Sequence, residues 1–287
     1  MTRTPVPTAT ATRLDELWTG RGPVVMGIVN CTPDSFSDGG KFLAADEAAS
    51  EGERQLEAGA RIIDVGGEST RPGADAVDAG EECRRVVPVI RELRRRHPWA
   101  VLSIDTTKVA VATAAVDAGA DLVNDVSATA LEDGMLELVA ASRAAIVLMH
   151  RRGTPRTMQQ DTSYHDVVAE VHDWLRERAA LAVTAGIPLQ RVWLDPGIGF
   201  GKDDAGNLAL LAALPELAAT GHPVVVGPSR KSFIGRLTGA EVGDRLGGTL
   251  AALIPSIVID RVVVRVHDPG PAVQFLQIGR MLAESAA

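Results

Sequence analysis

The feature that most constrains the fold of this chain is a regular alternation of short apolar runs with longer stretches of helical periodicity. The apolar runs do not alternate polar with apolar positions, which is typical of parallel strands that are covered on both faces. We therefore interpret each run as a buried strand. The eight expected strands cover Val24–Val29, Arg61–Val65, Val101–Ile104, Leu122–Asn124, Ala145–Met149, Val192–Leu194, Pro223–Val226 and Val262–Val266.

The stretches between the strands repeat apolar residues at the spacing of one helix face, and several end at glycine or before proline, as helices do. Alternating strands and helices predict a parallel sheet with right-handed crossovers. A doubly wound open sheet is the alternative, but its usual G-x-G-x-x-G loop is absent after the first strand. A count of eight favours an α/β fold consisting of a single (β/α)8 TIM barrel. The expected helices cover Ala44–Ala58, Glu82–Arg96, Val109–Ala118, Leu131–Ala141, Tyr164–Ala185, Leu208–Ala219, Arg245–Ile259 and Ala272–Ala283.

Length and composition agree with one such barrel. The chain has 287 residues, and a (β/α)8 barrel typically needs about 250. Aromatic residues make up only 3%, so Val, Leu, Ile and Ala must fill the core, as barrel interiors prefer. We expect residues 23–287 to form the barrel domain. Residues 1–22, rich in Thr and Pro, are expected to form a loosely ordered arm with one short helix near Leu14–Trp18.

Charge and cysteine content argue against several classes of function. The net charge of −8 leaves no basic face for nucleic acid, and the basic run Arg91–Arg96 is interpreted as a solvated helix end. The chain shows no signal segment and no apolar run of membrane-spanning length. Cys31 and Cys83 make no disulfide framework. We therefore expect a cytoplasmic protein without nucleic-acid or membrane partners.

Polar residues follow the apolar runs at the point where each run ends. In a (β/α)8 barrel the carboxyl ends of all strands meet at one face, which carries the active site in essentially all characterised enzymes. Any single aspartate there has an alternative interpretation as a helix N-cap, but polar ends on every strand together favour a functional site. These residues are Asn30, Asp64, Asp105, Asn124-Asp125, His150, Asp195, Ser229-Arg230-Lys231, and Arg265 with His267.

The chemistry of these residues divides the predicted rim in two. Asp105, Asn124 and Asp195 offer carboxylate and amide oxygens, which suit a flat heterocycle rich in N–H donors. Arg265 and His267 come from the last strand, near which phosphate sites are frequent in barrels. Two residues apart, they would share one side of a strand and form a cradle for an anion. The alternative for Arg265 is a structural ion pair with neighbouring carboxylates.

Two segments rich in Gly, Pro, Ser and Asp follow the first and second strands, at Cys31–Gly40 and Gly66–Gly73. This composition predicts mobile loops rather than helix starts. Loops on the catalytic face of a barrel can close over a site and exclude water. We therefore expect both segments to act as lids.

Seven segments resemble the dihydropteroate synthase family, in the order and spacing of that family, from about Val24 to the C-terminus. The first two are long and highly specific. Arg151-Arg152-Gly153 and Pro228 depart from the family's usual residues. The matching segments are Met26–Gly40, Asp64–Ala74, Ser103–Thr106, Asn124–Val126, Leu194–Lys202, Ser229–Lys231 and Arg265–Asp268.

The resemblance implies a transferase of folate biosynthesis. Such an enzyme joins p-aminobenzoate to 6-hydroxymethyl-7,8-dihydropterin diphosphate and releases diphosphate and 7,8-dihydropteroate. The family is a target of sulfonamides, and the resemblance implies Mg2+ as cofactor and a homodimer as the assembly. The apolar stretch Leu250–Ile259 fits either a dimer interface or a buried helix.

The resemblance also assigns roles to individual residues. Pterin and diphosphate binding is implied for Asn30, which would also hold Mg2+, and for Thr70, Asp105, Asn124, Val126, Met149, Asp195, Lys231, Arg265, Val266 and His267. The p-aminobenzoate pocket and its lid are implied for Phe36, Thr70, Arg71, Pro72, Phe200 and Ser229. The catalytic residues among these would be Arg71, Asp105, Lys231, Arg265 and His267.

Two other functions fit parts of the pattern. A pterin-dependent methyltransferase shares the barrel and the pterin-facing acids, but it would not need the Ser-Thr-Arg-Pro loop or Arg-Val-His. A non-catalytic pterin-binding paralogue would be indicated by the loss of Asn30, Arg71, Lys231 or Arg265, and all four are present.

Overall fold

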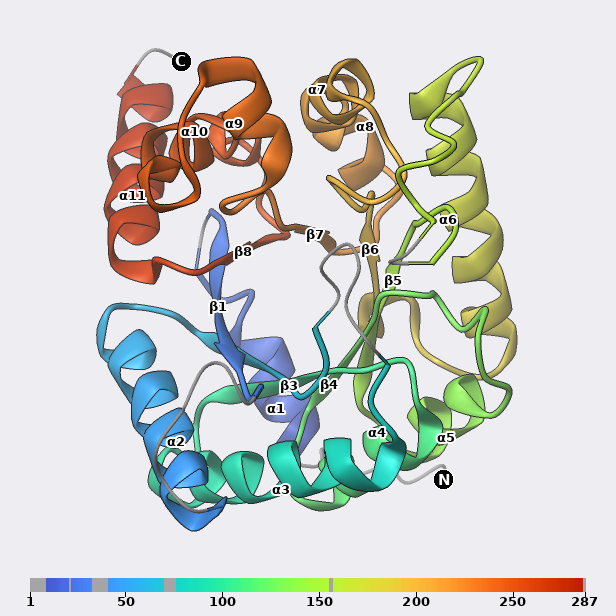
Figure 1. The fold of residues 1–287 in the computed structure, drawn as a ribbon, viewed down its shortest axis with the longest axis vertical. Coiled ribbons are helices and arrows are strands. Elements are labelled where there is room, and N and C mark those ends of the chain that lie inside the picture. The colour runs from blue at the N-terminus through green and yellow to red at the C-terminus, as the bar shows by residue number, and fades with distance from the viewer. Residues whose placement is uncertain (1–8, 21, 33–40, 70–75, 155–156, 286–287) are drawn as a thin grey trace, which may run out of the picture.

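The chain folds into a closed barrel of eight parallel strands, each paired with the next along the chain and β8 with β1. The computed structural model describes residues 9–20, 22–32, 41–69, 76–154 and 157–285. Helices surround the strands on all sides (Figure 1). The predicted single (β/α)8 TIM barrel is therefore confirmed. The strands are β1 (Val24–Asn30), β2 (Ile62–Gly66), β3 (Val101–Asp105), β4 (Leu122–Asp125), β5 (Ala145–Met149), β6 (Val192–Asp195), β7 (Val224–Val226) and β8 (Val262–Val266).

The helices differ from the expected ones mainly in the last third of the chain. One expected helix is divided into α7 and α8, with Pro215 in the first turn of α8. The expected helix Arg245–Ile259 is shortened to α10, and a 3-10 turn that contains Pro255 follows it. The short α9 was not predicted. The helices are α1 (Ala9–Glu16), α2 (Lys41–Glu57), α3 (Ala79–Arg96), α4 (Val109–Asp117), α5 (Met135–Ser142), α6 (Val167–Thr184), α7 (Asp204–Ala212), α8 (Leu214–Ala218), α9 (Ser232–Thr238), α10 (Leu246–Ala251) and α11 (Pro269–Ser285), with 3-10 turns η2 (Leu189–Arg191), η3 (Val242–Asp244) and η4 (Ile254–Ser256).

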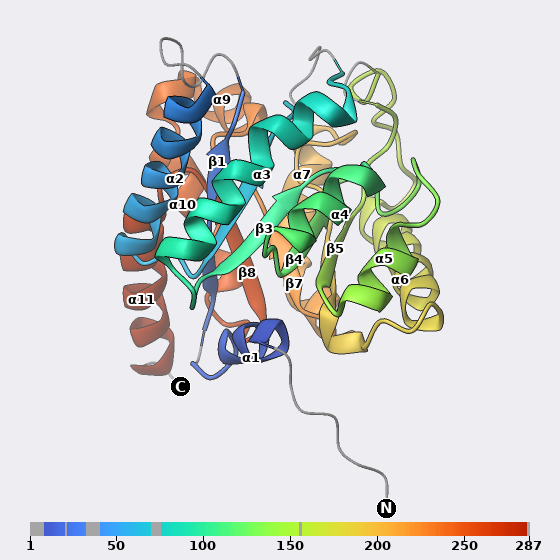
Figure 2. The same cartoon turned by 90° about the horizontal axis from the view of Figure 1, so that it is seen from below.

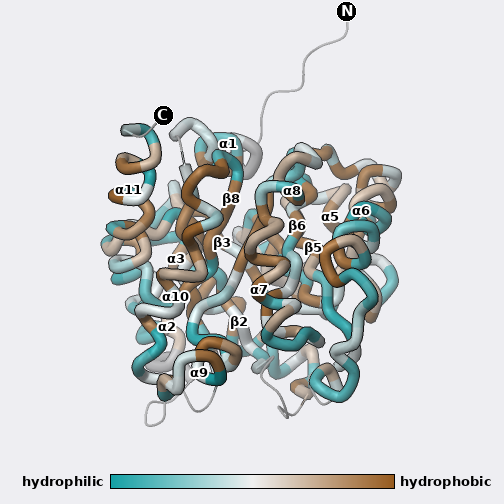
Figure 3. The backbone as a smooth tube through the Cα atoms, turned by 90° about the horizontal axis from the view of Figure 1, so that it is seen from above, coloured by the Kyte–Doolittle hydropathy of each residue, from teal (hydrophilic) through white to brown (hydrophobic). Residues whose placement is uncertain are grey.

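The inside of the barrel changes from apolar to polar along the strands. Side chains of each strand alternate between the barrel interior and the surrounding helices. Near the amino ends the inner positions form an apolar cluster that includes Met26, Ile62 and Trp193. Two residues further along, β2 and β6 place Asp64 and Asp195 on the same inner side. The outward positions pack under the helices in a larger apolar core, and Figure 3 shows the apolar strands inside polar helix surfaces such as that of α6.

Helix α1 covers the amino-terminal end of the barrel (Figure 2). Leu14 and Leu17 are buried in the same apolar cluster as the inner strand residues. The ring of Trp18 meets that of Trp193 edge-on, with 5.5 Å between the centroids. The short helix expected near Leu14–Trp18 is present as α1, at Ala9–Glu16, and apolar side chains of residues 14–18 fill the open barrel end. The division of the chain into an arm and a barrel domain stays a prediction.

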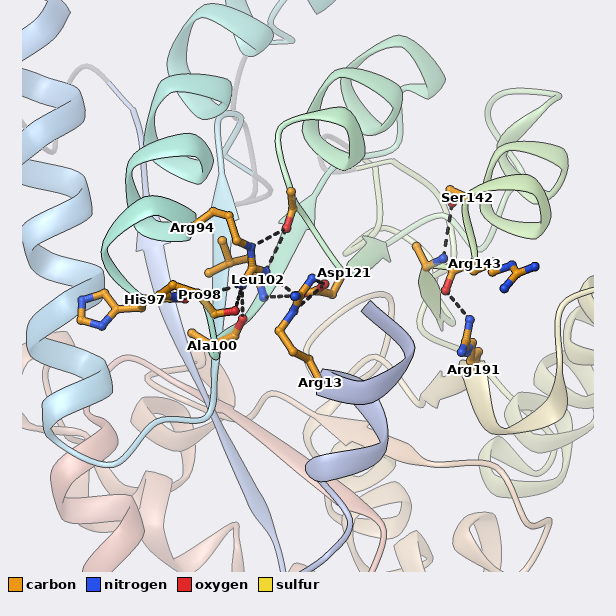
Figure 4. Close-up of polar contacts among 12 residues, drawn as sticks. Arg13, Arg94, His97, Pro98, Ala100, Leu102, Asp121, Ser142, Arg143 and Arg191 are labelled. Atoms are coloured by element: carbon orange, nitrogen blue, oxygen red, sulfur yellow. Dashed lines mark hydrogen bonds and ion pairs between the residues drawn. The ribbon is translucent and has the colours of Figure 1, made fainter. Parts of the chain in front are cut away.

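A buried aspartate anchors α1 to the barrel. Asp121 is fully buried and accepts from Arg13 at 2.5 Å, from Arg94 at 2.6 Å and from the backbone N–H of Leu102 at 3.1 Å. Figure 4 shows Arg13 from α1 and Arg94 from α3 reaching this carboxylate. The basic run Arg91–Arg96 is thus only partly a solvated helix end, because Arg94 also donates to backbone carbonyl groups beneath it.

Candidate active site

A pocket lies at the carboxyl ends of the strands. The three residues with chemistry suited to a flat heterocycle, Asp105, Asn124 and Asp195, all line it. Side chains from β3 to β6, with Lys231 from the segment after β7, meet there as the strand order predicts. Arg265 from β8 and Phe200 from the loop after β6 join them. The lining residues are Asp105, Asn124, Val126, Met149, Asp195, Gly197, Ile198, Phe200, Gly227, Lys231 and Arg265.

Asp64, to which the sequence analysis gave no role, lies beside the pocket residues inside the barrel. It is fully buried. Its Oδ1 accepts from the hydroxyl of Ser103 at 2.5 Å, and its Oδ2 accepts from Nδ2 of Asn124 at 2.9 Å and from Nε of Arg265 at 2.6 Å. The inward alternation of β2, which places Asp64 on the same side as Ile62, was the available signal.

Arg265 joins two carboxylates. Its Nε donates to Asp64, and a terminal nitrogen donates to Oδ2 of Asp105 at 2.9 Å. Ion pairs with neighbouring carboxylates were the alternative that the sequence left open for this arginine, and the structure contains them. The assignment of Arg265 to an anion stays a prediction.

Burial shifts the charged groups of the pocket toward their neutral forms. It raises the pKa of Asp195 to about 6, although the N–H of Gly197 donates to this carboxylate at 2.6 Å and opposes the shift. Burial also raises the pKa of Asp105, with Arg265 opposing it. Burial and the charge of Arg265 lower the pKa of Lys231 to about 8. Groups with such pKa values respond strongly to a ligand that brings charge or N–H donors.

The amide of Asn124 is oriented by Asp64. A carboxylate only accepts hydrogen bonds, so Nδ2 of Asn124 must face Asp64 and Oδ1 is left as an acceptor. Among the described residues no group donates to this Oδ1. Together with Asp105 and Asp195 it gives the pocket three acceptor side chains, which suit a flat ring with several N–H donors. A small apolar cluster beside them consists of Val126, Met149, Met158 and Phe200.

A buried lysine holds the loop after β6 against the end of β5. Nζ of Lys202 donates to Nδ1 of His150 at 3.0 Å and to the carbonyl oxygens of His150, Gly197 and Phe200 at 2.9–3.1 Å. Gly197 has a φ of +69°, and a Cβ there would lie 1.9 Å from the carbonyl oxygen of His150. Only glycine fits this approach. Phe200 in turn lies under Lys231, whose Nζ is 3.9 Å from the ring centroid.

His267 and Ser229 form a pair beside Arg265. The Ser229 hydroxyl accepts from the backbone N–H of His267 at 3.2 Å and lies 3.0 Å from its Nδ1. Burial and the charge of Arg265 lower the pKa of His267 to about 4, so the ring is neutral at pH 7. The neutral ring and the hydroxyl share one hydrogen bond at Nδ1.

Val266 does not place its side chain in the pocket. It is buried in the core between barrel and helices, because it points to the opposite side of β8 from Arg265. Any contact of Val266 with a ligand would have to come from its backbone.

Asn30 ends β1 and is exposed, next to Gly66 of β2. Within the described residues, no three His, Cys, Asp or Glu side chains lie close enough to hold a metal ion together. A cation at Asn30 would depend on one amide oxygen, water and oxygens of a ligand, which is a donor set that suits Mg2+. The expected lid residues Phe36, Thr70, Arg71 and Pro72 lie outside the described residues.

Comparisons with known proteins show the family of this chain. A family model described as pterin binding enzyme matches residues 26–267. The dihydropteroate synthase of Synechocystis sp. is 44% identical over 264 residues, which cover 92% of this chain and 91% of that protein. A solved structure of Xanthomonas albilineans dihydropteroate synthase with 4-aminobenzoic acid has 47% identity and a TM-score of 0.84, covering 93% of this chain and 94% of that one. A structure of the Xanthomonas enzyme in complex with 7,8-dihydropteroate has 43% identity and a TM-score of 0.80, covering 93% and 95%. The chain therefore belongs to the dihydropteroate synthase family of pterin-binding enzymes, which are transferases.

Proposed function

We propose that this chain joins p-aminobenzoate to 6-hydroxymethyl-7,8-dihydropterin diphosphate, forming 7,8-dihydropteroate and releasing diphosphate. The proposal rests on one observation: hydrogen-bond acceptors and cationic side chains line the same pocket. Asp105, Asn124 and Asp195 supply the acceptors, and Lys231 and Arg265 supply the cations. The acceptors suit the N–H groups of a pterin, and the cations suit a departing diphosphate. The ligands of the two Xanthomonas structures, 4-aminobenzoic acid and 7,8-dihydropteroate, support the same reaction.

In the proposed mechanism the bond between the pterin methylene carbon and the diphosphate oxygen breaks first, and its electron pair stays on the oxygen. Arg265 and His267 stabilise the charge that develops on this oxygen. The Asp105 carboxylate stabilises the cationic ring that remains. The amine nitrogen of p-aminobenzoate then forms the new bond and loses a proton to water. A weakly basic aromatic amine needs no strong catalytic base for this step.

Asn30 would hold Mg2+ through its side-chain oxygen, and the ion would neutralise charge on the diphosphate as a Lewis acid. Phe200 and Ser229 would border the p-aminobenzoate pocket, with Lys231 between the two substrates. Phe36, Thr70, Arg71 and Pro72 would close over the site and exclude water from the cationic ring.

The decisive assay mixes purified protein with the pterin diphosphate, Mg2+ and p-aminobenzoate and measures dihydropteroate and diphosphate. If neither product forms, the proposed function is wrong. Arg265→Ala should weaken binding of the pterin diphosphate far more than binding of a free pterin, because only the former carries the anion. Arg176→Ala is the matched control, since Arg176 forms an exposed ion pair with Asp173 on α6. Equal losses for both ligands in Arg265→Ala would contradict the role of Arg265.

We also infer that two copies of the chain associate through an apolar surface on η4 and α11. The two elements are in contact there, because Arg280 of α11 donates to the carbonyl oxygen of Ile257 at 3.2 Å. Of the expected stretch Leu250–Ile259, Leu253 and Ile259 are buried, whereas Ile254 and Val258 are exposed. Large exposed apolar surfaces of this kind commonly mark interfaces. The exposed residues are Ile254, Val258, Ile278, Met281 and Leu282.

Sedimentation velocity tests this assembly. Met281→Glu should convert the dimer to a monomer, because it puts a charge into the apolar contact. Leu181→Glu introduces the same charge at an exposed leucine of α6 and should leave the dimer intact. A monomeric wild-type chain, or dissociation by both variants alike, would contradict the assignment.

We propose that the protein is located in the cytoplasm, because both of its cysteine thiols are free. Cys31 and Cys83 are both free, and Cys31 is buried. No helix within the described part of the chain has the length and apolarity to cross a bilayer. Recovery in the membrane or secreted fraction of cells that express the chain would contradict this location.

A further inference from the structure

Asp64 contacts two pocket residues without lining the pocket itself. Its Oδ2 accepts from Nδ2 of Asn124 at 2.9 Å and from Nε of Arg265 at 2.6 Å, and the carboxylate is fully buried. Asn124 belongs to the acceptor group of the pocket, and Arg265 belongs to the cations. One buried carboxylate therefore touches both halves of the site.

The two ion pairs of Arg265 differ in what a ligand can reach. The side chain of Asp64 is 0% exposed, whereas that of Asp105 is 10% exposed and lines the pocket. A ligand in the pocket can displace the terminal nitrogen of Arg265 from Asp105, but it cannot reach the bond between Nε and Asp64. The guanidinium is thus fixed at one nitrogen and exchangeable at another.

Asp105 binds a pterin ring more strongly when it does not also bind Arg265. A ring amino group and its neighbouring N–H bind a carboxylate best through two parallel hydrogen bonds, which use both oxygens. In the structure Oδ2 of Asp105 already accepts from Arg265. A carboxylate oxygen can accept two hydrogen bonds, as Oδ2 of Asp64 does, but two donors then share its charge. The ring contact therefore strengthens when Arg265 leaves Oδ2.

We propose that Asp64 is a positioning residue that couples ring binding to diphosphate binding. This inference rests on the proposed function. When diphosphate binds, the terminal nitrogen of Arg265 passes from Asp105 to a phosphate oxygen, Asp64 retains Nε, and both oxygens of Asp105 become available to the ring. Asp64 meanwhile keeps the Asn124 amide turned so that Oδ1 serves the pocket. Because coupling of binding equilibria is reciprocal, each ligand then raises the affinity for the other by the same factor.

Titration calorimetry with unsubstituted pterin measures this coupling without turnover. In the wild-type protein, saturating diphosphate with Mg2+ should tighten pterin binding by about fivefold or more, at the lower end of typical coupling. In Asp64→Asn the factor should fall to near one, because the neutral amide no longer holds the guanidinium by its Nε. Ser103→Ala is the matched control. It removes the hydrogen bond to Oδ1 of Asp64 and leaves both Oδ2 contacts, so the coupling should persist.

Wild-type coupling that is absent, or that is unchanged in a folded Asp64→Asn variant, would overturn the proposal. If Asp64→Asn does not fold, the proton NMR signal of the Arg265 Nε–H in the wild-type protein decides. The chemical shift of this proton should stay the same when diphosphate and pterin bind. A large change in the chemical shift would show that the hydrogen bond to Asp64 has broken. Coupling is measured with ligand fragments, whereas the proposed function is tested by product formation. Coupling without product would therefore refute only the function, and product without coupling would refute only the role of Asp64.

Discussion

Lys202 provides a sharp test of how the pocket is held in place. Its buried ammonium donates to His150, Gly197 and Phe200 from within the loop after β6. Lys202→Met keeps the length of the side chain but removes every donor. Each buried acceptor left without a partner costs about 1–3 kcal/mol. The loop carries three residues of the pocket wall, so we expect a weaker affinity for pterin together with a lower stability.

The pH dependence of this stability loss follows from the pKa of Lys202, which burial lowers from 10.5 to about 7. Between about pH 7 and 10.5 the unfolded wild-type chain binds one proton more at this residue than the folded chain does. The free energy of unfolding therefore rises with pH in that window, by about 1.4 kcal/mol per pH unit. Methionine has no proton to lose. The difference between wild type and Lys202→Met should thus grow by roughly 2 kcal/mol from pH 7.5 to pH 9.

Urea unfolding followed by circular dichroism at pH 7.5, 8.25 and 9 measures this difference. Lys108→Met is the matched control, because ion pairs with Glu68 and Glu82 raise the pKa of Lys108 despite its burial. The contribution of Lys108 is fully present below pH 10.5, so its stability difference should stay constant over the same range. A constant or shrinking difference for Lys202→Met would refute the reasoning.

Two further predictions concern ligand binding and the barrel end. The affinity for free pterin should fall by about tenfold per pH unit below about pH 6, because the carboxylate of Asp195, whose pKa burial raises to about 6, must be ionised to accept from the ring. Calorimetry from pH 5 to 7.5 measures this, and Asp195→Asn should bind more weakly with a shallower profile, because Asp105 still titrates. Arg13→Ala should lower the free energy of unfolding by about 1–3 kcal/mol, since Asp121 keeps its pair with Arg94. The double variant Arg13→Ala/Arg94→Ala should lose more than the sum of the single losses, because it leaves a buried carboxylate without a counter-ion; additive urea-unfolding losses would contradict this.

Local patterns in the sequence were sufficient for the barrel and for the position of its site. The runs Ala145–Met149 and Val262–Val266 were predicted with the bounds that the structure has, because a strand covered on both faces is apolar throughout. The helices were predicted less well where proline divides them, at Pro215 and Pro255. These breaks depend on how the chain packs after a proline as well as on the proline itself.

Local sequence patterns could not predict the side-chain contacts inside the barrel. Asp64 is 60 residues from Asn124 and 201 residues from Arg265 along the chain. They meet because strands point their side chains inward in register and because β8 closes on β1. Likewise nothing in the local sequence of Lys202 indicates that His150 will accept from it, since their contact depends on the pairing of β5 with β6.

The sequence by itself determined which elements form, in which order, and which polar residues stand at the carboxyl ends of the strands, because these properties depend on periodicity and residue type. Only the tertiary structure decided which of those residues share a hydrogen bond, which have their pKa shifted by burial and which, like Val266, face away from the pocket. It also decided that α1 covers the barrel. Those properties depend on register, closure and the exclusion of water, which arise only when distant segments pack together.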